Sequence, residues 1–544
     1  MICFFEPRLP TCDNLTLNNM KKISPLLVAA FCIISPLFAQ SPVIQWQNTI
    51  GGNGSDGLFS LQQTSDGGYI LGGHSASNIS GDKTENGLGL TDYWVVKLDA
   101  TGDIQWQNTI GGSDGDLLRS LQQTADGGYI LGGDSYSNIS GDKTENNWGD
   151  RDYWVIKLDA TGTIQWQNTI GGNDYDQLAS IQQTADGGYI LGGISNSNVS
   201  GDKTGDNFGE YDYWVLKLDP SGAIQWQNTI GGNNGDEIFS LQQTADGGYI
   251  LGGASESSLS GDKTENSLGG FDYWVVKLDV TGAIQWENTI GGSSNDAIFS
   301  LQQTADGGYI LGGHSNSDIS GDKTENSLGI YDFWVVRLDA TGSIQWQNTI
   351  GGNKYDSIFA LQQAADGGYI ISGWSESNIS GDKTENCLGK ADYWVLKLDA
   401  NGSIKWQNTI GGGSADVIHS LKQTVDGGYI LGGTSDSNIS SDKSENCLGG
   451  YDFWVIKLAP ETVPTAEAPT SPTSVMIYPN PTTDVLFVHS ESPTTLCLRN
   501  AFGQILLTQT IQEDSKIDLS HYPNGIYFLI EMETGIGHKI LKNY

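Results

Sequence analysis

Oxygen-bearing side chains recur at regular spacing along most of the chain and could bind a cation. The run Asp82-Lys83-Thr84-Glu85-Asn86 alternates oxygen side chains, a pattern typical of calcium-binding loops. The glutamate that ends a hand-type calcium loop is missing, and aspartate in a turn commonly accepts hydrogen bonds from nearby backbone amides. We therefore favour turn capping over Ca²⁺ binding and expect no cofactor. The aspartates that begin the copies of this run are Asp82, Asp142, Asp202, Asp262, Asp322, Asp382 and Asp442.

Aromatic side chains at positions that differ between otherwise similar segments form a second group of candidates. An aromatic face beside acidic and amide groups suits a sugar ring, which offers CH faces and hydroxyl groups. Packing between neighbouring loops is the alternative for the same side chains. The residues that we expect to contact a ligand are Tyr136, Trp148, Tyr175, Tyr355 and Trp374, and Phe208 and Tyr211 occupy similar variable positions.

Residues that could perform catalysis are scarce. The repeated region holds the histidines His74, His314 and His419, the last at a different repeat position from the first two. The chain has no Gly-x-Ser-x-Gly elbow, no His-Glu-x-x-His zinc motif and no phosphate-binding loop. The sialidase pattern Ser-x-Asp-x-Gly-x-Thr-Trp is also missing. Catalysis needs an asymmetric group of residues, and near-perfect repetition opposes it, so we expect a protein that is not an enzyme.

The charge balance excludes two classes of partner. Acidic residues outnumber basic residues by 64 to 27, which gives a net charge of −37. A nucleic-acid-binding protein needs a basic face to neutralise phosphates, and an anionic membrane surface attracts basic segments. We expect neither partner for this chain.

All these candidates lie in a unit of 60 residues that is repeated seven times along the chain. The segment Ile44–Gly52 returns nearly unchanged at 104, 164, 224, 284, 344 and 404. Each unit holds four strand-like runs, which in the first unit are Leu58–Gln63, Gly68–Gly73, Tyr93–Leu98 and Ile104–Ile110, and no segment shows a helical period. Four antiparallel strands per repeat predict an all-β, seven-bladed β-propeller over residues 44–458. A solenoid is the alternative, although it would want polar capping repeats.

The phase of the repeat predicts how the ring closes. The first unit begins with Ile44–Ile50, and the seventh ends with Tyr451–Leu458, so these two runs can pair within one blade. Because successive strands reverse direction, the tight turns at 64–67 and 99–103 share one side, and the loops at 51–57 and 74–92 share the other. The units differ mainly on the long-loop side, whereas the strands and tight turns barely change. Loops on a rigid scaffold commonly bind ligands, although relaxed constraint on exposed loops would give the same variation.

Two runs resemble known propellers. The stretch from Tyr93 to Gly102, followed by Trp106, resembles the strand–turn–strand of tryptophan-docked propellers, of which the pyrroloquinoline-quinone type is the nearest comparison. The run from Gln62 to Ile70 is similar to repeats of bacterial surface proteins thought to be propellers. The resemblance implies a fold and no particular activity.

The N-terminal residues 1–39 are expected to be an extension plus a signal peptide. Met20-Lys21-Lys22 gives a basic start, Ile23–Phe38 is largely apolar, and Ala39 precedes Gln40 as a small-residue exit. We expect translation to begin at Met20 and cleavage to fall between Ala39 and Gln40. The apolar stretch is shorter than the roughly 20 residues of a membrane-spanning helix and contains two prolines, so we expect no transmembrane anchor in the mature chain.

The C-terminal part begins with a proline- and threonine-rich segment, 459–474, that is typical of an extended linker. Residues 475–544 open with Pro479-Asn480-Pro481, carry Gly525 and Tyr527 in a late strand, and end with Lys539 and Lys542. This arrangement resembles the C-terminal sorting domain of type IX secretion cargo in Bacteroidetes. The resemblance implies a small β-sandwich, the type IX secretion machinery as partner, and delivery across the outer membrane to the surface or the medium. An appended β-sandwich binding module is the alternative.

Together these observations favour a secreted or surface-attached propeller that binds a glycan or a surface protein without catalysis. An extracellular enzyme acting on polysaccharide and a structural surface component are the alternatives. Cys387 and Cys447 occupy equivalent sites in neighbouring units. We expect them not to form a disulfide, because equivalent points on adjacent blades are too far apart for a bridge of about 6 Å between Cα atoms.

Overall fold

The computed structural model describes residues 41–461, 475–500, 504–532 and 537–542. The expected signal peptide, its cleavage site at Ala39 and Gln40, and residues 462–474 of the expected linker lie outside these ranges. The described residues form strands joined by turns and loops and contain no helix.

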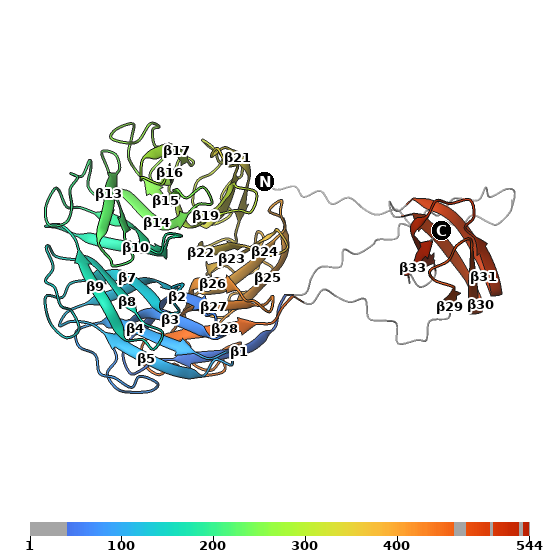
Figure 1. Ribbon diagram of the computed structural model, residues 1–544, viewed down its shortest axis with the longest axis horizontal. Helices are drawn as coiled ribbons and strands as arrows, with labels where there is room; N and C mark the ends of the chain where they lie inside the picture. The colour runs from blue at the N-terminus through green and yellow to red at the C-terminus, as the bar shows by residue number, and fades with distance from the viewer. Residues whose placement is uncertain (1–40, 462–474, 501–503, 533–536, 543–544) are drawn as a thin grey trace, which may run out of the picture. The chain divides into compact units, whose positions relative to one another are not determined.

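Residues 44–458 form seven four-stranded antiparallel sheets arranged as the blades of a propeller (Figure 1). The innermost strands line the central channel, and they are β2 (Asp56–Gln63), β6 (Asp116–Gln123), β10 (Asp176–Gln183), β14 (Asp236–Gln243), β18 (Asp296–Gln303), β22 (Asp356–Gln363) and β26 (Asp416–Gln423). The second strands are β3 (Tyr69–Ser75), β7 (Tyr129–Ser135), β11 (Tyr189–Ser195), β15 (Tyr249–Ser255), β19 (Tyr309–Ser315), β23 (Tyr369–Ser375) and β27 (Tyr429–Ser435).

The remaining strands of each blade lie farther from the channel. The third strands are β4 (Asp92–Leu98), β8 (Asp152–Leu158), β12 (Asp212–Leu218), β16 (Asp272–Leu278), β20 (Asp332–Leu338), β24 (Asp392–Leu398) and β28 (Asp452–Leu458). The outermost strands are β5 (Ile104–Ile110), β9 (Ile164–Ile170), β13 (Ile224–Ile230), β17 (Ile284–Ile290), β21 (Ile344–Ile350), β25 (Ile404–Ile410) and β1 (Ile44–Ile50). All four predicted strands of the first unit are therefore present, with starts that differ by at most two residues.

The ring closes through the first strand, as the repeat phase predicts. Strand β1 pairs antiparallel with β28, which places Ile50 opposite Phe453 and Thr49 opposite Trp454. The seventh sheet therefore has the order β1-β28-β27-β26, with one strand from the start of the repeats and three from their end.

The hydrophobic core lies between neighbouring blades. In the layer between the first two blades, Tyr93 and Val95 pack with Leu118 and Trp154, and the Tyr93 hydroxyl donates to the Trp154 carbonyl at 3.0 Å. Every residue of the third strands is buried, which explains why their Tyr-Trp-Val runs lack the alternation of a half-exposed strand. Because each layer needs both blades, the ring gains stability from closure.

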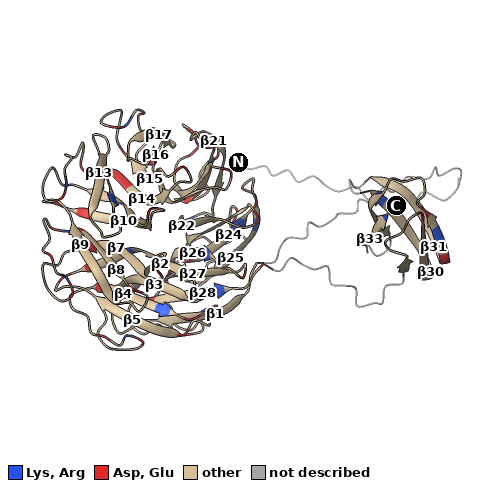
Figure 2. Cartoon of the chain, in the orientation of Figure 1, with Lys and Arg blue, Asp and Glu red and all other residues tan. Residues whose placement is uncertain are grey.

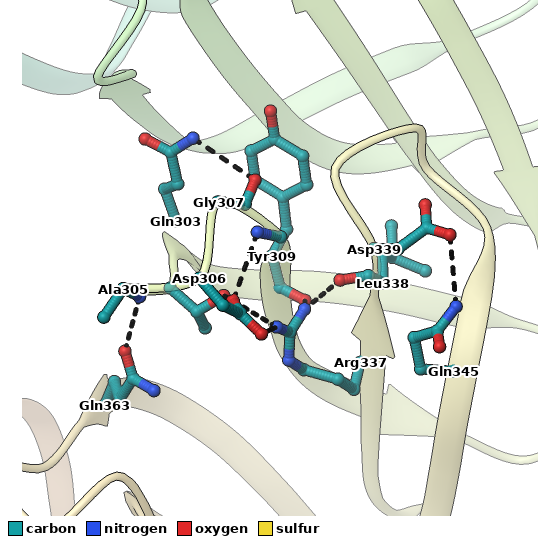
Figure 3. Close-up of polar contacts among 12 residues, drawn as sticks. Gln303, Ala305, Asp306, Gly307, Tyr309, Arg337, Leu338, Asp339, Gln345 and Gln363 are labelled. Carbon is teal, nitrogen blue, oxygen red and sulfur yellow. Dashed lines mark hydrogen bonds and ion pairs between the residues drawn. The ribbon is translucent and has the colours of Figure 1, made fainter.

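The tight turns are held by a repeated ion pair. The Lys97 ammonium, almost fully buried, lies 2.8 Å from the Asp66 carboxylate, whose Oδ1 also accepts from the Gly68 amide at 3.0 Å. Asp66 therefore caps its own turn, and the buried Lys97 ammonium holds the carboxylate in place. Figure 3 shows the same arrangement in the fifth blade, where Arg337 replaces lysine beside Asp306.

The C-terminal residues form a separate five-stranded sheet. Its strands are β29 (Val475–Tyr478), β30 (Val485–Asn500), β31 (Ile505–Asp518), β32 (Gly525–Glu531) and β33 (Gly537–Lys542). Tyr527 is buried with Leu498 and Leu529 in its core. Asn480 accepts a hydrogen bond from the Leu541 amide at 2.9 Å and donates to the Lys539 carbonyl at 2.6 Å. The Pro-Asn-Pro segment is therefore tied to the last strand.

Candidate functional site

The channel mouth at the long-loop end carries a ring of side chains that the repeat does not keep constant. The fourth residue of each innermost strand lies here, at a β-bulge that all seven inner strand pairs share. We name this ring the collar, and it consists of Phe59, Arg119, Ala179, Phe239, Phe299, Phe359 and His419.

Most of the collar is a continuous arc of aromatic rings. The ring centroids of Phe239 and Phe299 lie 4.8 Å apart, and those of Phe359 and His419 lie 5.3 Å apart. His419 stacks on Phe59 at 4.7 Å, and the Arg119 guanidinium lies 5.4 Å from the Phe59 ring. Burial lowers the pKa of His419 to about 4, so the imidazole is neutral at physiological pH.

The arc is interrupted at Ala179, whose methyl group is far shorter than the other collar side chains. A pocket of about 560 Å³ opens beside it, between the third and fourth blades. Its walls combine aromatic and aliphatic side chains with a few polar groups. The lining residues are Tyr175, Gln177, Ala179, Ile194, Asn196, Tyr211, Glu237, Ile238 and Phe239. We call this the Ala179 pocket.

An arginine from the neighbouring loop supports one wall of the pocket. Arg151 donates to the Tyr175 hydroxyl at 2.6 Å and to the Tyr136 hydroxyl at 3.2 Å, and its guanidinium lies within 5.1 Å of both ring centroids. Arg151 also pairs with the fully buried Asp134, which Arg119 contacts at 3.4 Å. Two predicted residues, Tyr136 and Tyr175, are thus brought together by a buried charge network.

Glu237 is the carboxylate of the pocket and faces Tyr211. The two side chains are hydrogen-bonded, and burial raises the pKa of Glu237 above its usual range while the Tyr211 hydrogen bond opposes that rise. Glu256, on the next loop, adds a smaller increase through repulsion between like charges. Tyr211 has its own pKa raised by burial and by Glu237, so it remains a hydrogen-bond donor.

Tyr355 and Trp374 lie in a second aromatic group, between the fifth and sixth blades. Tyr355 stacks on Tyr331 at 5.9 Å and approaches Trp374 at 6.5 Å. Tyr331 also contacts His314, whose Nδ1 lies 2.9 Å from the Ser357 hydroxyl. This group fills the space between the loops and leaves Tyr355 37% exposed.

Trp148 lies away from both groups. Its indole covers Gly201 in the loop of the next blade and lines a shallow pocket with Glu145, Thr169 and Asp202. Leu88 covers Gly141 in the same way, so the position has a packing role in every blade where it is large and apolar. Trp148 nevertheless remains 58% exposed.

The Asp82-type carboxylates turn toward the backbone. Asp82 accepts from the Gly51 amide at 3.2 Å, and each of its six equivalents makes the same contact. Glu85 of the same run accepts from the Thr109 amide at 2.6 Å. Among the described residues, no group of three or more His, Cys, Asp or Glu side chains is arranged to hold a metal ion.

A pair of buried aspartates lies at each blade junction. Asp92 and Asp116 are fully buried, and each has one carboxylate oxygen with no hydrogen-bond partner among the described residues. Burial raises the pKa of Asp116 to about 6 and that of Asp152, the equivalent of Asp92 in the second blade, to about 7. Cys387 and Cys447 are free thiols, as expected, and each lies 2.8 Å from a carboxylate of this kind.

Sequence reasoning located the variable face but placed its variation in the loops alone. Positions 57 and 59 of the repeat lie inside the innermost strand, and they vary as strongly as the loops. The expectation that the strands barely change was therefore wrong for position 59, whereas position 57 had been assigned to the variable loop at 51–57 and lies in the strand instead. Comparing the seven copies at position 59 would have indicated Ala179 and Arg119, because the other five residues there are aromatic.

Comparisons with known proteins decide the nature of the C-terminal part. Residues 476–542 match the family model described as a secretion system C-terminal sorting domain. This chain carries a type IX sorting domain. Its partner is the type IX secretion machinery, and its destination is the cell surface or the medium. Asn480 and Lys542, two of the residues that suggested the match, lie close together, because Thr482 forms a β-bridge with Lys542. The Lys542 ammonium also donates to the Leu519 carbonyl at 2.8 Å.

The propeller has weaker similarities. Over 386 residues the chain is 23% identical to the regulatory protein FlaEY of Caulobacter vibrioides, which covers 65% of this chain and 40% of that protein. The chain therefore matches less than half the length of this relative. The Pan2 WD40 domain of Neurospora crassa is similar with 12% identity and a TM-score of 0.38, over 74% of this chain and 89% of that one. A mutant of Synechocystis apocarotenoid oxygenase is similar with 12% identity and a TM-score of 0.34, over 78% of this chain and 95% of that one. The strand topology, rather than these scores, establishes the propeller.

Acidic residues are spread around the propeller with few basic ones among them (Figure 2). Within the ranges described, no helix is long and apolar enough to cross a membrane.

Proposed function

We propose that the propeller is a non-catalytic glycan-binding module delivered to the cell surface or the medium by its sorting domain. The Ala179 pocket is the observation that carries this proposal. It is the place where the aromatic collar is interrupted, and its volume of about 560 Å³ falls within the range of small-molecule sites.

The chemistry of the pocket favours a sugar over a fully apolar ligand. Tyr175, Tyr211 and Phe239 offer ring faces for the CH groups of a pyranose. Gln177, Asn196 and Glu237 supply hydrogen-bond donors and acceptors for its hydroxyl groups. Arg151 holds Tyr175 in place, so little conformational entropy is lost when the ligand binds.

Retention on a panel of polysaccharides tests the proposal. Ala179→Phe fills the pocket with the side chain that four other blades carry at this position, so the fold should tolerate it. We expect retention of a bound polysaccharide to fall at least tenfold, which corresponds to about 1.4 kcal/mol. Phe208→Leu is the matched control, because leucine occupies that exposed position in most blades. Equal retention of both variants would reject the pocket.

An enzyme acting on polysaccharide is the second candidate, and one observation favours it. Glu237 is partly buried with a raised pKa, whereas the nearby Glu256 is exposed, and glycoside hydrolysis uses two carboxylates in unlike environments. Release of shortened product that Glu237→Gln abolishes while retention persists would establish the enzyme. Retention without product release supports the binding module.

A further inference from the structure

The central channel has a second distinctive section, nearer the tight-turn end. A cavity of about 320 Å³ lies on the axis and is lined by consecutive residues of the innermost strands. One ring around it carries serine hydroxyls, such as Ser60, in six blades and Ala360 in the other. The hydroxyls are engaged within the wall, because Ser60 accepts from the Leu121 amide at 3.1 Å and lies 3.3 Å from the Leu121 carbonyl.

The next ring consists of glutamine amides that are oriented by the neighbouring blade. In each case the side-chain oxygen accepts a backbone N–H from the following blade, at 2.6 to 2.9 Å. A backbone N–H can only donate, so the amide oxygen must face it and the NH₂ group must face away. The six residues are Gln62, Gln122, Gln182, Gln242, Gln302 and Gln362. The ring therefore presents N–H donors to the channel, while each amide oxygen faces the neighbouring blade.

The seventh member of this ring is Lys422, which carries an ammonium group in place of an amide. Its side chain is open to the channel, while protein surrounds the channel on all sides. Burial lowers the pKa of Lys422, and no charged group contributes to that shift. No carboxylate in the described part of the chain forms an ion pair with it. The ammonium thus adds a further donor and a positive charge to a ring whose amide oxygens face the channel wall.

The carboxylates at this end of the channel do not offset that charge. Asp66 and Asp426, in the tight turns, pair with Lys97 and Lys457 at 2.8 and 2.9 Å. The other five turns carry the same kind of pair. Although the chain as a whole is acidic, the turn carboxylates nearest the ring are neutralised by their own partners.

We propose that the ring of six glutamine amides and Lys422 is a binding site for a small oxyanion on the channel axis. Hydrogen bonds from an ammonium or from N–H groups to an anion are stronger than those between neutral groups, and a partly enclosed channel strengthens them further. The chemistry suits an inorganic sulfate or phosphate, or the carboxylate of an acidic sugar. This site is distinct from the Ala179 pocket and does not depend on glycan binding there.

Calorimetric titration of the full chain tests the site, with sodium sulfate, sodium phosphate and sodium glucuronate in separate arms at constant ionic strength. We expect one saturable site per chain in at least one arm. Binding in the sulfate or phosphate arm identifies a free inorganic anion, and binding only in the glucuronate arm identifies the carboxylate of an acidic sugar. The absence of saturable binding in every arm would overturn the proposal.

Two substitutions connect the binding to the ring. Lys422→Gln installs the residue that the other six blades carry. Its side-chain oxygen can accept a hydrogen bond from the backbone N–H of Gln63, so the thermal midpoint should not fall. We expect it to weaken binding at least tenfold. Gln242→Glu places a negative charge in the ring and should abolish binding. Lys405→Gln removes an equally positive but exposed side chain and should leave the affinity unchanged. Unaltered binding in Lys422→Gln, or equal loss in Lys405→Gln, would assign the effect to something other than this ring.

Discussion

Replacement of Ile50 by alanine measures directly whether β1 holds the ring closed in solution. Ile50 is 3% exposed and packs with Leu58, Trp94 and Phe453, residues of the first and last blades. Truncation of a buried isoleucine to alanine costs about 2 to 5 kcal/mol of unfolding free energy through lost burial and the cavity left behind. If β1 were detached, Ile50 would already be in water and the substitution would cost close to nothing.

The chain supplies a matched control in Ile230, the equivalent residue of β13, which is 1% exposed and lies in the third blade, away from the closure. The assay is urea-induced unfolding followed by tryptophan fluorescence. We expect Ile50→Ala and Ile230→Ala to lower the unfolding free energy by the same amount to within about 1 kcal/mol, since both sites have the same surroundings. A full cost for Ile230→Ala with a negligible cost for Ile50→Ala would refute closure through β1.

Deletion of Ile44–Ile50 extends the same reasoning. This deletion removes the Thr49 hydroxyl that contacts the buried Lys443 ammonium, and it exposes one edge of β28. A buried charge left without its partner adds a penalty to the lost apolar burial, and an unpaired strand edge promotes association. We expect a lower melting temperature and aggregates in size-exclusion chromatography, whereas an unchanged melting temperature would contradict the closed ring.

Four further outcomes follow from the structure. Asp152 has a folded-state pKa of about 7, raised above its usual 3.8, so its contribution to folding stability is lost as pH rises through 7. Asp66 has a pKa lowered to about 2, so its contribution to stability is present above pH 3.8 and is lost as pH falls below that value. The urea midpoint should therefore be higher at pH 4.5 than at pH 8 and fall again below pH 3.8; a lower midpoint at pH 4.5 than at pH 8 would contradict this assignment. Burial and a neighbouring carboxylate raise the pKa of Cys387 to about 12, so a thiol reagent at pH 7.5 should modify it far more slowly in the folded than in the urea-unfolded chain, as mass spectrometry can measure. Removal of 475–544 should leave the propeller folded but retained in the periplasm, and normal surface delivery in a fractionation experiment would show that the sorting domain is dispensable. Chelation of divalent cations should leave the melting temperature unchanged, because Asp82 is already engaged by a backbone amide; a clear drop would indicate a bound cation.

The propeller could be predicted because its information is local and repeated. Short strand-like runs, tight turns with glycine and a constant period of 60 residues specify four strands per blade and seven blades. Even the closure of the ring follows, since Ile44–Ile50 matches the outermost strand of every other unit. The sorting domain could be predicted for a different reason, because its short motifs follow one another along the chain in the order that is typical of such domains.

The binding surfaces depend on contacts between residues about 60 positions apart, which a local pattern does not encode. Phe239 and Phe299 meet because the innermost strands of neighbouring blades lie side by side, with a bulge at the fourth residue of each strand. Ala179 matters through the space that it leaves between larger neighbours. The Gln62 amide presents its NH₂ group to the channel because the next blade supplies a backbone N–H to its oxygen. Side-chain identity could be read from the sequence, whereas the direction of each donor and the volume between side chains arise when neighbouring blades pack together.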